Sequence, residues 1–431
     1  MATIVIVGAG IGGMPMAYDI KRQLGSQHTV KVVSALDQFQ FTPSNPWVGV
    51  GWRTAEDISF PLEPALTRKG IEFIHATVTE IKPKENYLVL TDGRRVDYDY
   101  VILATGPYLA FEEVEGLGPS SHGGHTVSVC TTGHSLEAFE GWEAFCQQPA
   151  PIVVGAVQGA SCFGPAYEYA MIMDTDLRKR KIRKDVKMTF VTSEPYIGHL
   201  GLGGVGDSKG MLESIMRQRH INWICNAKVS KIEQGMMYVD EHDSNGNLIK
   251  SHQLPFGYSM MLPAFKGPKF LQQADEQLVN PRGMVKVDQF NRNPTYHNLD
   301  ALGGVVAIPP VEATPVPVGT PKTGLMIEGM MTAICHNIEN QLAGKEPCEE
   351  ATWNTICLAD LGDTGAAFVA LPQIPPRNLT WAKQGKWVHL AKIAFEKYFI
   401  RNMKNGNSEP IYQKYVMKML GIVRLKSEEK R

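Results

Sequence analysis

Short apolar runs that end in glycine divide the chain into repeated strand–turn–helix units. Residues 3–8 (TIVIVG) form a β-branched run, which a helix-like segment to about Leu24 and a second strand at Thr29–Ser34 follow. The order returns at residues 151–155 (PIVVG), with residues 188–195 (MTFVTSEP) as the next strand. A strand, a helix and a second strand in this order predict a parallel sheet. We therefore expect an α/β fold.

Residues 98–106 (YDYVILATG) give another buried strand of the first unit. The two units lie far apart in the sequence, and a late strand returns to the first unit after the second. We expect two Rossmann-like dinucleotide-binding domains, the second inserted in the first, and a C-terminal region of amphipathic helices. The expected ranges are 1–110 with 286–345, 111–285, and 346–431.

Composition indicates a folded protein with an uneven distribution of charge. The 431 residues are 43% hydrophobic and 20% charged, and the formal net charge is −1, which excludes a disordered chain. From Trp381 to Arg431 there are 12 Lys/Arg against 4 Asp/Glu, a local +8 that leaves −9 elsewhere. No stretch of 18 apolar residues suits a bilayer-spanning helix. The start, MATIVIVGAG, has no secretory signal visible, so we expect no export signal.

Basic amphipathic segments lie in this C-terminal part. Residues 386–404 place apolar side chains at helical spacing among lysines and an arginine, and residues 412–424 repeat the pattern. Aromatic-rich basic helices suit a membrane surface, and two ordinary helices packed on the core are the alternative. Nucleic acid is set aside as a partner because no base-reading motif is present. We expect peripheral membrane contact.

The first glycine loop, GAGIGG, supplies Gly8, Gly10 and Gly13 directly after a strand and before a helix. Glycines at this spacing allow a tight turn, close approach of a pyrophosphate and a helix N-terminus that faces it. The loop predicts dinucleotide binding, and a glycine-rich turn without a ligand is the alternative. Ser34 stands where a ribose-binding acid is expected, and Asp37 is the nearest carboxylate. The ATG at residues 104–106 is typical of FAD-domain flavoproteins.

The second loop departs from a nucleotide fingerprint. Gly155, Val157 and Ala160 occupy the positions where three glycines would stand. A branched side chain at Val157 blocks the approach of a pyrophosphate, so NAD(P) binding is not expected here. The loop offers Cys162 near a helix start instead, where the helix dipole lowers the pKa of a thiol. We expect either a reactive nucleophile or a small buried hydrophobe at this position.

Cysteine usage excludes two classes of protein. Seven cysteines form an odd set in a large chain, which argues against a secreted disulfide framework. None lies in a CxxC or CxxxxC pair, so no zinc, iron–sulfur or other metal site is expected.

Five longer segments carry a specific resemblance along the full chain. They are FQFTPSNPWVGVGW (39–52), GASCFGPAYEYAMI (159–172), EPYIGHLG (194–201), AIPPVEATPVP (307–317) and GKWVHLAKIAFEKYF (385–399). In these segments the chain closely resembles bacterial sulfide:quinone oxidoreductases. This family belongs to the two-dinucleotide-domain flavoproteins, with glutathione reductase and flavocytochrome c sulfide dehydrogenase as relatives.

The resemblance implies the redox residues. Family members carry two sulfur-bridged cysteines on opposite sides of the flavin, matching Cys162 in GASCFG and Cys357 in NTICLAD. A third family cysteine, which helps to release polysulfide, matches Cys130 in SVCTTGH. His134 and His199 stand in matching motifs, where each either carries protons or shapes the site. The implied activity passes electrons from sulfide through the cysteine pair and FAD to a membrane quinone.

The resemblance also implies the binding residues. Gly303 and Gly304 stand where relatives end a strand with an aspartate that binds the ribitol, so backbone amides must replace it. Lys392 supplies positive charge, and Phe395 and Tyr412 line a quinone slot. The expected FAD-binding residues are Gly8, Gly10, Gly12, Gly13, Ser34, Ala35, Thr42, Val78, Thr105, Gly106, Gly303, Thr323, Gly324 and Lys392.

The expected partners are sulfide, ubiquinone or another membrane quinone, and a membrane surface; a homo-oligomer is left open. Two alternatives remain at this point. A type II NADH:quinone oxidoreductase shares FAD and membrane attachment, although Val157 and Ala160 argue against it. A flavin-binding redox sensor without catalysis is the other alternative, and turnover with sulfide and quinone would exclude it.

Overall fold

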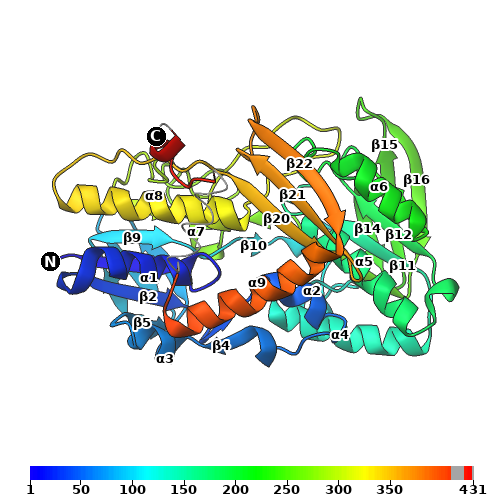
Figure 1. Cartoon of the computed structure of the whole chain (residues 1–431), viewed down its shortest axis with the longest axis horizontal. Coiled ribbons are helices and arrows are strands. Elements are labelled where there is room, and N and C mark those ends of the chain that lie inside the picture. Colours follow the sequence, from blue (N-terminus) through cyan, green and yellow to red (C-terminus); the bar gives the residue numbers. More distant parts are fainter. Residues whose placement is uncertain (409–421, 430–431) are drawn as a thin grey trace.

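A five-stranded parallel sheet forms the first part of the computed structural model, which describes residues 1–408 and 422–429 (Figure 1). Its strand order is β19-β9-β1-β2-β5, and Val7 at the end of β1 lies opposite Val33 and Leu103. The bounds are Thr3–Val7 for β1, Thr29–Ser34 for β2, Glu72–His75 for β5, Tyr100–Leu103 for β9 and Leu299–Ala301 for β19.

Both faces of this sheet are covered, which explains the continuous apolar run of β1. Ile4 and Ile6 pack with the helices α1 (Gly13–Leu24) and α8 (Gly324–Leu342). Val5 and Val7 point to the other face and pack with the three-stranded antiparallel sheet of β6 (Val78–Lys82), β7 (Tyr87–Leu90) and β8 (Arg95–Asp97). A strand buried on both faces shows no polar alternation.

A second parallel sheet lies between β9 and β19 in the sequence, as expected for an inserted unit. Its order is β13-β12-β11-β17, and the antiparallel sheet β14-β15-β16 stands beside it. The bounds are Ile152–Ala156 (β11), Met188–Thr192 (β12), Ile221–Ile224 (β13), Ala227–Glu233 (β14), Met236–His242 (β15), Leu248–Pro255 (β16) and Tyr258–Leu262 (β17). The insertion agrees with the predicted fold class, and the domain boundaries stay a prediction.

Helices cover this second sheet and connect it to the rest. The main ones are α4 (Thr132–Gln147), α5 (Gly164–Lys179) and α6 (Ser208–Gln218). Short elements complete the body: β3 (Gln38–Gln40), α2 (Asn45–Val48), β4 (Ser59–Pro61), α3 (Leu62–Thr67), β10 (Tyr108–Leu109), β18 (Phe265–Lys266) and α7 (Lys269–Gln272).

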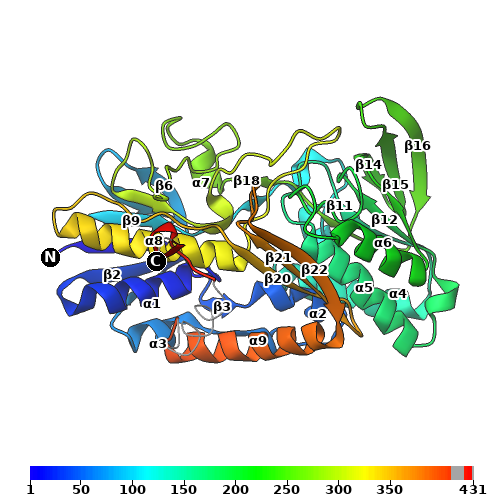
Figure 2. The same cartoon turned by 45° about the horizontal axis from the view of Figure 1, so that its top comes forward.

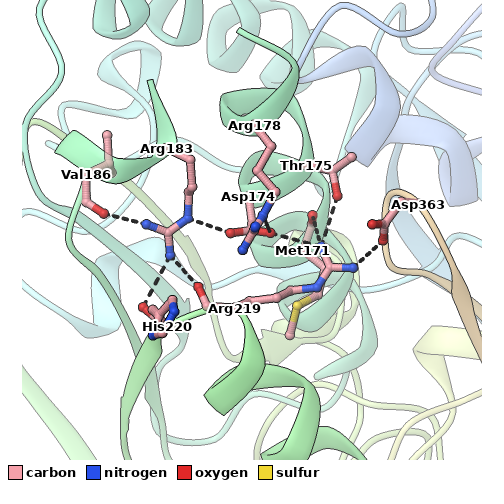
Figure 3. Close-up of polar contacts among 9 residues, drawn as sticks. All are labelled: Met171, Asp174, Thr175, Arg178, Arg183, Val186, Arg219, His220 and Asp363. Atoms are coloured by element: carbon pink, nitrogen blue, oxygen red, sulfur yellow. Dashed lines mark hydrogen bonds and ion pairs between the residues drawn. The ribbon is translucent and has the colours of Figure 1, made fainter. Parts of the chain in front are cut away.

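A buried carboxylate anchors α5 to its surroundings (Figure 3). Asp174 accepts hydrogen bonds from Arg178 at 2.8 Å, Arg183 at 2.5 Å and Arg219 at 3.0 Å. The Arg219 guanidinium also binds Asp363 in the turn after β20. A buried charge needs such partners, and these ones tie α5 to the C-terminal sheet.

The C-terminal part contains a sheet that the apolar pattern did not reveal. Strands β20 (Thr355–Asp360), β21 (Gly365–Leu371) and β22 (Leu379–Gly385) form an antiparallel sheet before α9 (Lys386–Asn405) and the short α11 (Lys426–Glu429). Figures 1 and 2 show α9 running along one side of the molecule from β22 towards α3. The first predicted amphipathic helix is therefore present. Most of the second, with Tyr412, lies outside the described residues. Among the residues described, no helix is long and apolar enough to cross a bilayer.

Candidate active site

The first glycine loop is compact where the chain crosses itself and open where a ligand would lie. A Cβ at Gly8 (φ +105°) would lie 2.5 Å from the Ala104 carbonyl oxygen, and one at Gly13 would lie 2.0 Å from that of Gly8. A Cβ at Gly10 would meet nothing within 4 Å. This arrangement fits the pyrophosphate of a dinucleotide above Gly10, facing the N-terminus of α1.

Other predicted cofactor residues follow the carboxyl ends of the parallel strands. Ser34 ends β2 and Ala35 follows it, Thr105 and Gly106 follow β9, and Gly303 follows β19. Ligands of open α/β sheets bind along this edge. Gly106 (φ +70°) also has open space at its Cβ position. The Ser34 hydroxyl accepts a bond from the Leu36 amide at 3.1 Å, which leaves its hydrogen for a ribose.

The remaining cofactor positions differ in their surroundings. A Cβ at Gly12 would lie 2.7 Å from the Leu302 side chain, so this glycine serves packing. Thr42 opens a single helical turn and is exposed, whereas Val78 is buried at the start of β6. Their assignment to FAD stays a prediction.

The N-terminus of α8 is tied to the strand that carries Cys357. The Thr323 hydroxyl lies 2.7 Å from that of Thr355 and donates to Gln373 Oε1 at 2.9 Å. Gln373 is fully buried and donates to the Pro321 carbonyl at 2.7 Å. Gly324 begins the helix with open space at its Cβ position. The positive end of the α8 dipole is thus fixed beside β20.

Three cysteines from distant segments share one partly buried environment. Cys130 directly precedes the N-cap Thr131 of α4, Cys162 precedes α5, and Cys357 lies within β20. The pKa of the Cys162 thiol is raised by burial and then by the nearby Cys357 and Cys130. The fold therefore brings the predicted pair and the third cysteine within electrostatic reach of one another.

The expected lowering of the Cys162 pKa is wrong. Burial raises the pKa of Cys162 to about 12, and raises those of Cys130 and Cys357 to about 11. A hydrogen bond from the Gly164 amide lowers the pKa of Cys162, but the loss of hydration outweighs it. The site therefore favours neutral sulfur, and a thiolate formed here is poorly solvated.

An ion pair that the sequence could not reveal stands beside Cys357. Lys392 forms a buried salt bridge with Glu168, and the same Glu168 oxygen accepts from the Asp360 amide at 2.5 Å. Glu168 raises the pKa of Cys357, whereas Lys392 lowers it. The predicted cation is thus present near the sulfur, together with an unpredicted carboxylate.

Asp360 extends this cluster to the surface. Its carboxylate accepts from Trp47 Nε1 at 2.5 Å and lies 2.8 Å from His389 Nδ1. The Lys392 ammonium lies 5.2 Å from the centre of the Trp47 ring. Glu168 stands six residues after Cys162, and Asp360 stands three residues after Cys357. The partners of these carboxylates, Lys392 and Trp47, lie far away in the sequence. Nothing in a single sequence marks them.

A second lysine that sequence reasoning missed lies near Cys162. Burial lowers the pKa of Lys322 to about 8, and the Cys162 sulfur acts in the opposite direction. The preceding segment is bound to the cysteine loop, because the Gly319 amide donates to the Ala160 carbonyl at 2.8 Å. In the sequence, only the motif PKTG at residues 321–324 could have drawn attention to this lysine.

The two predicted histidines have different environments. His199 is buried; its Nδ1 accepts from the Gly201 amide at 3.2 Å, which leaves Nε2 to donate to Glu312 at 2.7 Å. Burial lowers its pKa, against the effect of Glu312. His134 Nε2 lies 3.2 Å from His122 Nε2, and burial and His122 lower its pKa. Within the described residues, neither ring forms a hydrogen bond to a cysteine, so their roles stay predictions.

The second loop is closed to a dinucleotide. Val157 is fully buried in a core cluster, and its amide donates to the Leu262 carbonyl at 3.0 Å. Gln158 makes two 3.0 Å hydrogen bonds to the Val229 backbone, and the Gly159 amide donates to Pro317 at 2.7 Å. The backbone that would hold a pyrophosphate is therefore bound to the protein itself.

Phe395 lies on α9 and is 41% exposed. Its ring centre lies 6.1 Å from that of Phe41 and 5.8 Å from that of Phe399. An exposed aromatic group of this kind suits contact with a planar ring, and Tyr412 lies outside the described residues. The quinone assignment stays a prediction.

Comparison with known proteins finds similarity along nearly the whole chain. Residues 2–326 match the model of the family described as pyridine nucleotide-disulphide oxidoreductase. A sulfide-quinone reductase of Aquifex aeolicus is 41% identical over 96% of this chain and 94% of its own. The X-ray structure of the sulfide:quinone oxidoreductase from that bacterium has a TM-score of 0.94 at 40% identity, covering 99% of this chain and 97% of the other.

More distant similarity is of two kinds. A mouse mitochondrial sulfide:quinone oxidoreductase is 24% identical over 71% of this chain and 66% of its own. NDH2 from Plasmodium falciparum, solved in complex with NADH, has a TM-score of 0.70 at 13% identity, covering 97% and 98% of the two chains. That second likeness concerns the fold alone.

Proposed function

We propose that this chain, which belongs to the pyridine nucleotide-disulphide oxidoreductase family and to its sulfide-quinone reductases, is an FAD-dependent sulfide:quinone oxidoreductase. It oxidises sulfide to polysulfide or sulfur and reduces a membrane quinone. The observation that carries the proposal is the proximity of Cys162, Cys357 and Cys130 in one partly buried cluster. The closed loop at Val157 supports sulfide over NADH as the electron donor.

The chemistry proceeds by exchange at a sulfur bridge between Cys162 and Cys357. Hydrosulfide forms a bond to one bridge sulfur, and the electron pair of the broken bond leaves on the other cysteine as a thiolate. Closing the bridge again around the added sulfur releases two electrons and one proton. FAD, which the loop of Gly8, Gly10 and Gly13 would hold, would supply the two-electron acceptor for this step, and reduction of the quinone would consume the two electrons and two protons.

The residues of the site assist this exchange through charge. Lys392 favours a thiolate at Cys357, and Lys322 supplies a second ammonium near Cys162. Because the cysteines are partly buried, each charge acts more strongly on the sulfur beside it than it would in water. Cys130 serves the release of the growing sulfur chain, and His199 with its Glu312 partner holds the neighbouring loop.

Membrane contact gives the enzyme access to the quinone. Trp387 is 52% exposed and Leu390 is 64% exposed on α9, near the exposed Phe395. Large apolar side chains that protrude from a basic helix suit an interfacial position. We infer that α9 rests on the membrane surface and that the quinone ring enters beside Phe395.

Two measurements on the purified holoprotein test the proposal. Stopped-flow mixing with sulfide under anaerobic conditions should bleach the flavin band rapidly, whereas NADH should not. Steady turnover with sulfide and a short-chain quinone should follow. Rapid bleaching by NADH without bleaching by sulfide would overturn the proposal in favour of an NADH:quinone oxidoreductase. Bleaching without turnover would point to a redox sensor.

A further inference from the structure

A charged groove lies beside the C-terminal half of α9. Its volume is about 780 Å³, and Trp52, Arg53, Asp57, Glu396, Lys397, Ile400, Arg401, Lys404 and Asn405 line it. Four cations thus face two carboxylates. The lining comes from α9 and from the loop that precedes β4, so the fold builds the groove from two separate segments.

Both carboxylates of the groove have partners. Glu396 is buried, binds Arg53 Nε at 3.0 Å and accepts from the Ser44 hydroxyl. Asp57 accepts from the Thr54 amide at 2.9 Å. The groove therefore keeps an excess of positive charge after its internal pairs are formed.

Three of the cations have no carboxylate partner in the described part of the chain. Lys397, Arg401 and Lys404 stand at i, i+4 and i+7 of α9, so they share one helix face. The ammonium of Lys404 lies 5.6 Å from the centre of the Phe60 ring. Arg53 is held rigidly, because it also donates to the Trp52 carbonyl at 2.9 Å and its guanidinium carbon lies 4.7 Å from the Trp47 ring centre.

The position of the groove on α9 indicates the kind of anion. Leu390 and Arg401 lie on the same helix, roughly 16 Å apart along its axis. A helix inclined at a bilayer surface would immerse its apolar half, with Trp387 and Leu390, and lift its basic half to the headgroup layer. That layer is about 5–8 Å thick on each side of a bilayer.

From these observations we propose that the groove of Arg53, Lys397, Arg401 and Lys404 binds the phosphate of an anionic phospholipid headgroup. Arginine binds phosphate oxygens in a bidentate manner, and the lysines add charge. The inference rests on the proposed membrane contact of α9 and adds to it a defined lipid site. The bound headgroup would hold α9 at a fixed depth while quinone enters.

Vesicle sedimentation of the holoprotein tests the site. Vesicles that mix phosphatidylcholine with phosphatidylglycerol should bind the protein more tightly than vesicles of phosphatidylcholine alone. Arg401→Ala and Lys397→Ala should each weaken binding to the anionic vesicles about fivefold, which corresponds to about 1 kcal/mol per cation. Lys250→Ala removes an exposed charge from β16 and serves as the matched control. An equal loss in Lys250→Ala, or equal binding to both vesicles, would overturn the site.

Calorimetry with a soluble lipid separates a headgroup site from a general anion site. Dihexanoyl-phosphatidylglycerol should bind wild type at one site and bind Arg401→Ala about fivefold more weakly, and inorganic phosphate should not displace it. Equal competition by inorganic phosphate would overturn the lipid assignment. Sulfide-dependent flavin bleaching is measured on the same samples. Its absence in wild type would count against the proposed function and leave the lipid result to be judged by itself.

Discussion

Burial is the main cause of the raised pKa of Cys357, and Glu168 raises that pKa further, so replacing Glu168 by glutamine should lower it. Glu168 raises the pKa of Cys357 and contributes to raising that of Cys162, whereas Lys392 lowers that of Cys357. The amide of glutamine keeps the shape and can still accept from the Asp360 backbone. With Lys392 left as the nearby charge, we expect the pKa of Cys357 to fall from about 11.

The size of the effect follows from the link between pKa and thiolate content. At about pH 8, a thiol with a pKa of about 11 is ionised in about one molecule in 1,000, and each unit of lowering raises that fraction about tenfold. The same substitution leaves a buried ammonium without its carboxylate. Removing one partner of a buried pair costs about 3–5 kcal/mol of folding stability, so urea unfolding must first show that the variant is folded.

Site-resolved alkylation measures the shift. The reduced protein is treated with iodoacetamide across a pH series, and the modified peptides are quantified by mass spectrometry. The alkylation midpoint of Cys357 should move to lower pH in Glu168→Gln, and the exposed Cys348 serves as an internal control. An unchanged or higher midpoint at Cys357, with Cys348 unaffected, would refute the assigned role of Glu168.

Three further predictions concern the cysteines and the two loops. Cys162→Ser and Cys357→Ser should each slow sulfide-dependent flavin reduction by at least about 100-fold with FAD retained, whereas replacing the exposed Cys348 by serine should not; normal stopped-flow traces in either site variant would contradict the pair. Gly13→Ala should cost about 1–3 kcal/mol of stability in urea unfolding. Gly10→Ala should unfold normally and bind FAD weakly, because its Cβ meets open space where the pyrophosphate would lie. Equal FAD affinity in Gly10→Ala and wild type would refute the predicted pyrophosphate site. Val157→Gly should lose about 1–3 kcal/mol of folding stability, because it leaves a cavity in the core, and should still show no flavin bleaching by NADH. Rapid bleaching by NADH would mean that the Val157 side chain alone closes the loop.

The strand–helix units and the glycine loop could be predicted because their determinants are local. The run TIVIVG places a strand directly before glycines that the chain needs for contact, at Gly8 and Gly13. The insertion of the second sheet also followed from the order of the runs. The antiparallel sheet of β20 to β22 was missed, because TICLAD and GAAFVAL lack the alternation of a half-exposed strand.

The electrostatics of the site could not be predicted from spacing. A cysteine near a helix start suggests a lowered pKa, yet tertiary burial decides the sign at Cys162. Lys392 pairs with Glu168 across 224 positions, and Gln373 reaches Thr323 across 50. Only the folded chain brings such partners together.

The most direct test is a non-reducing peptide map of the oxidised protein by mass spectrometry. A peptide containing Cys162 should be joined through one or more sulfur atoms to a peptide containing Cys357, and treatment with excess sulfide should release both. The account would be contradicted if both thiols were free in the oxidised protein while sulfide still reduced the flavin at the normal rate.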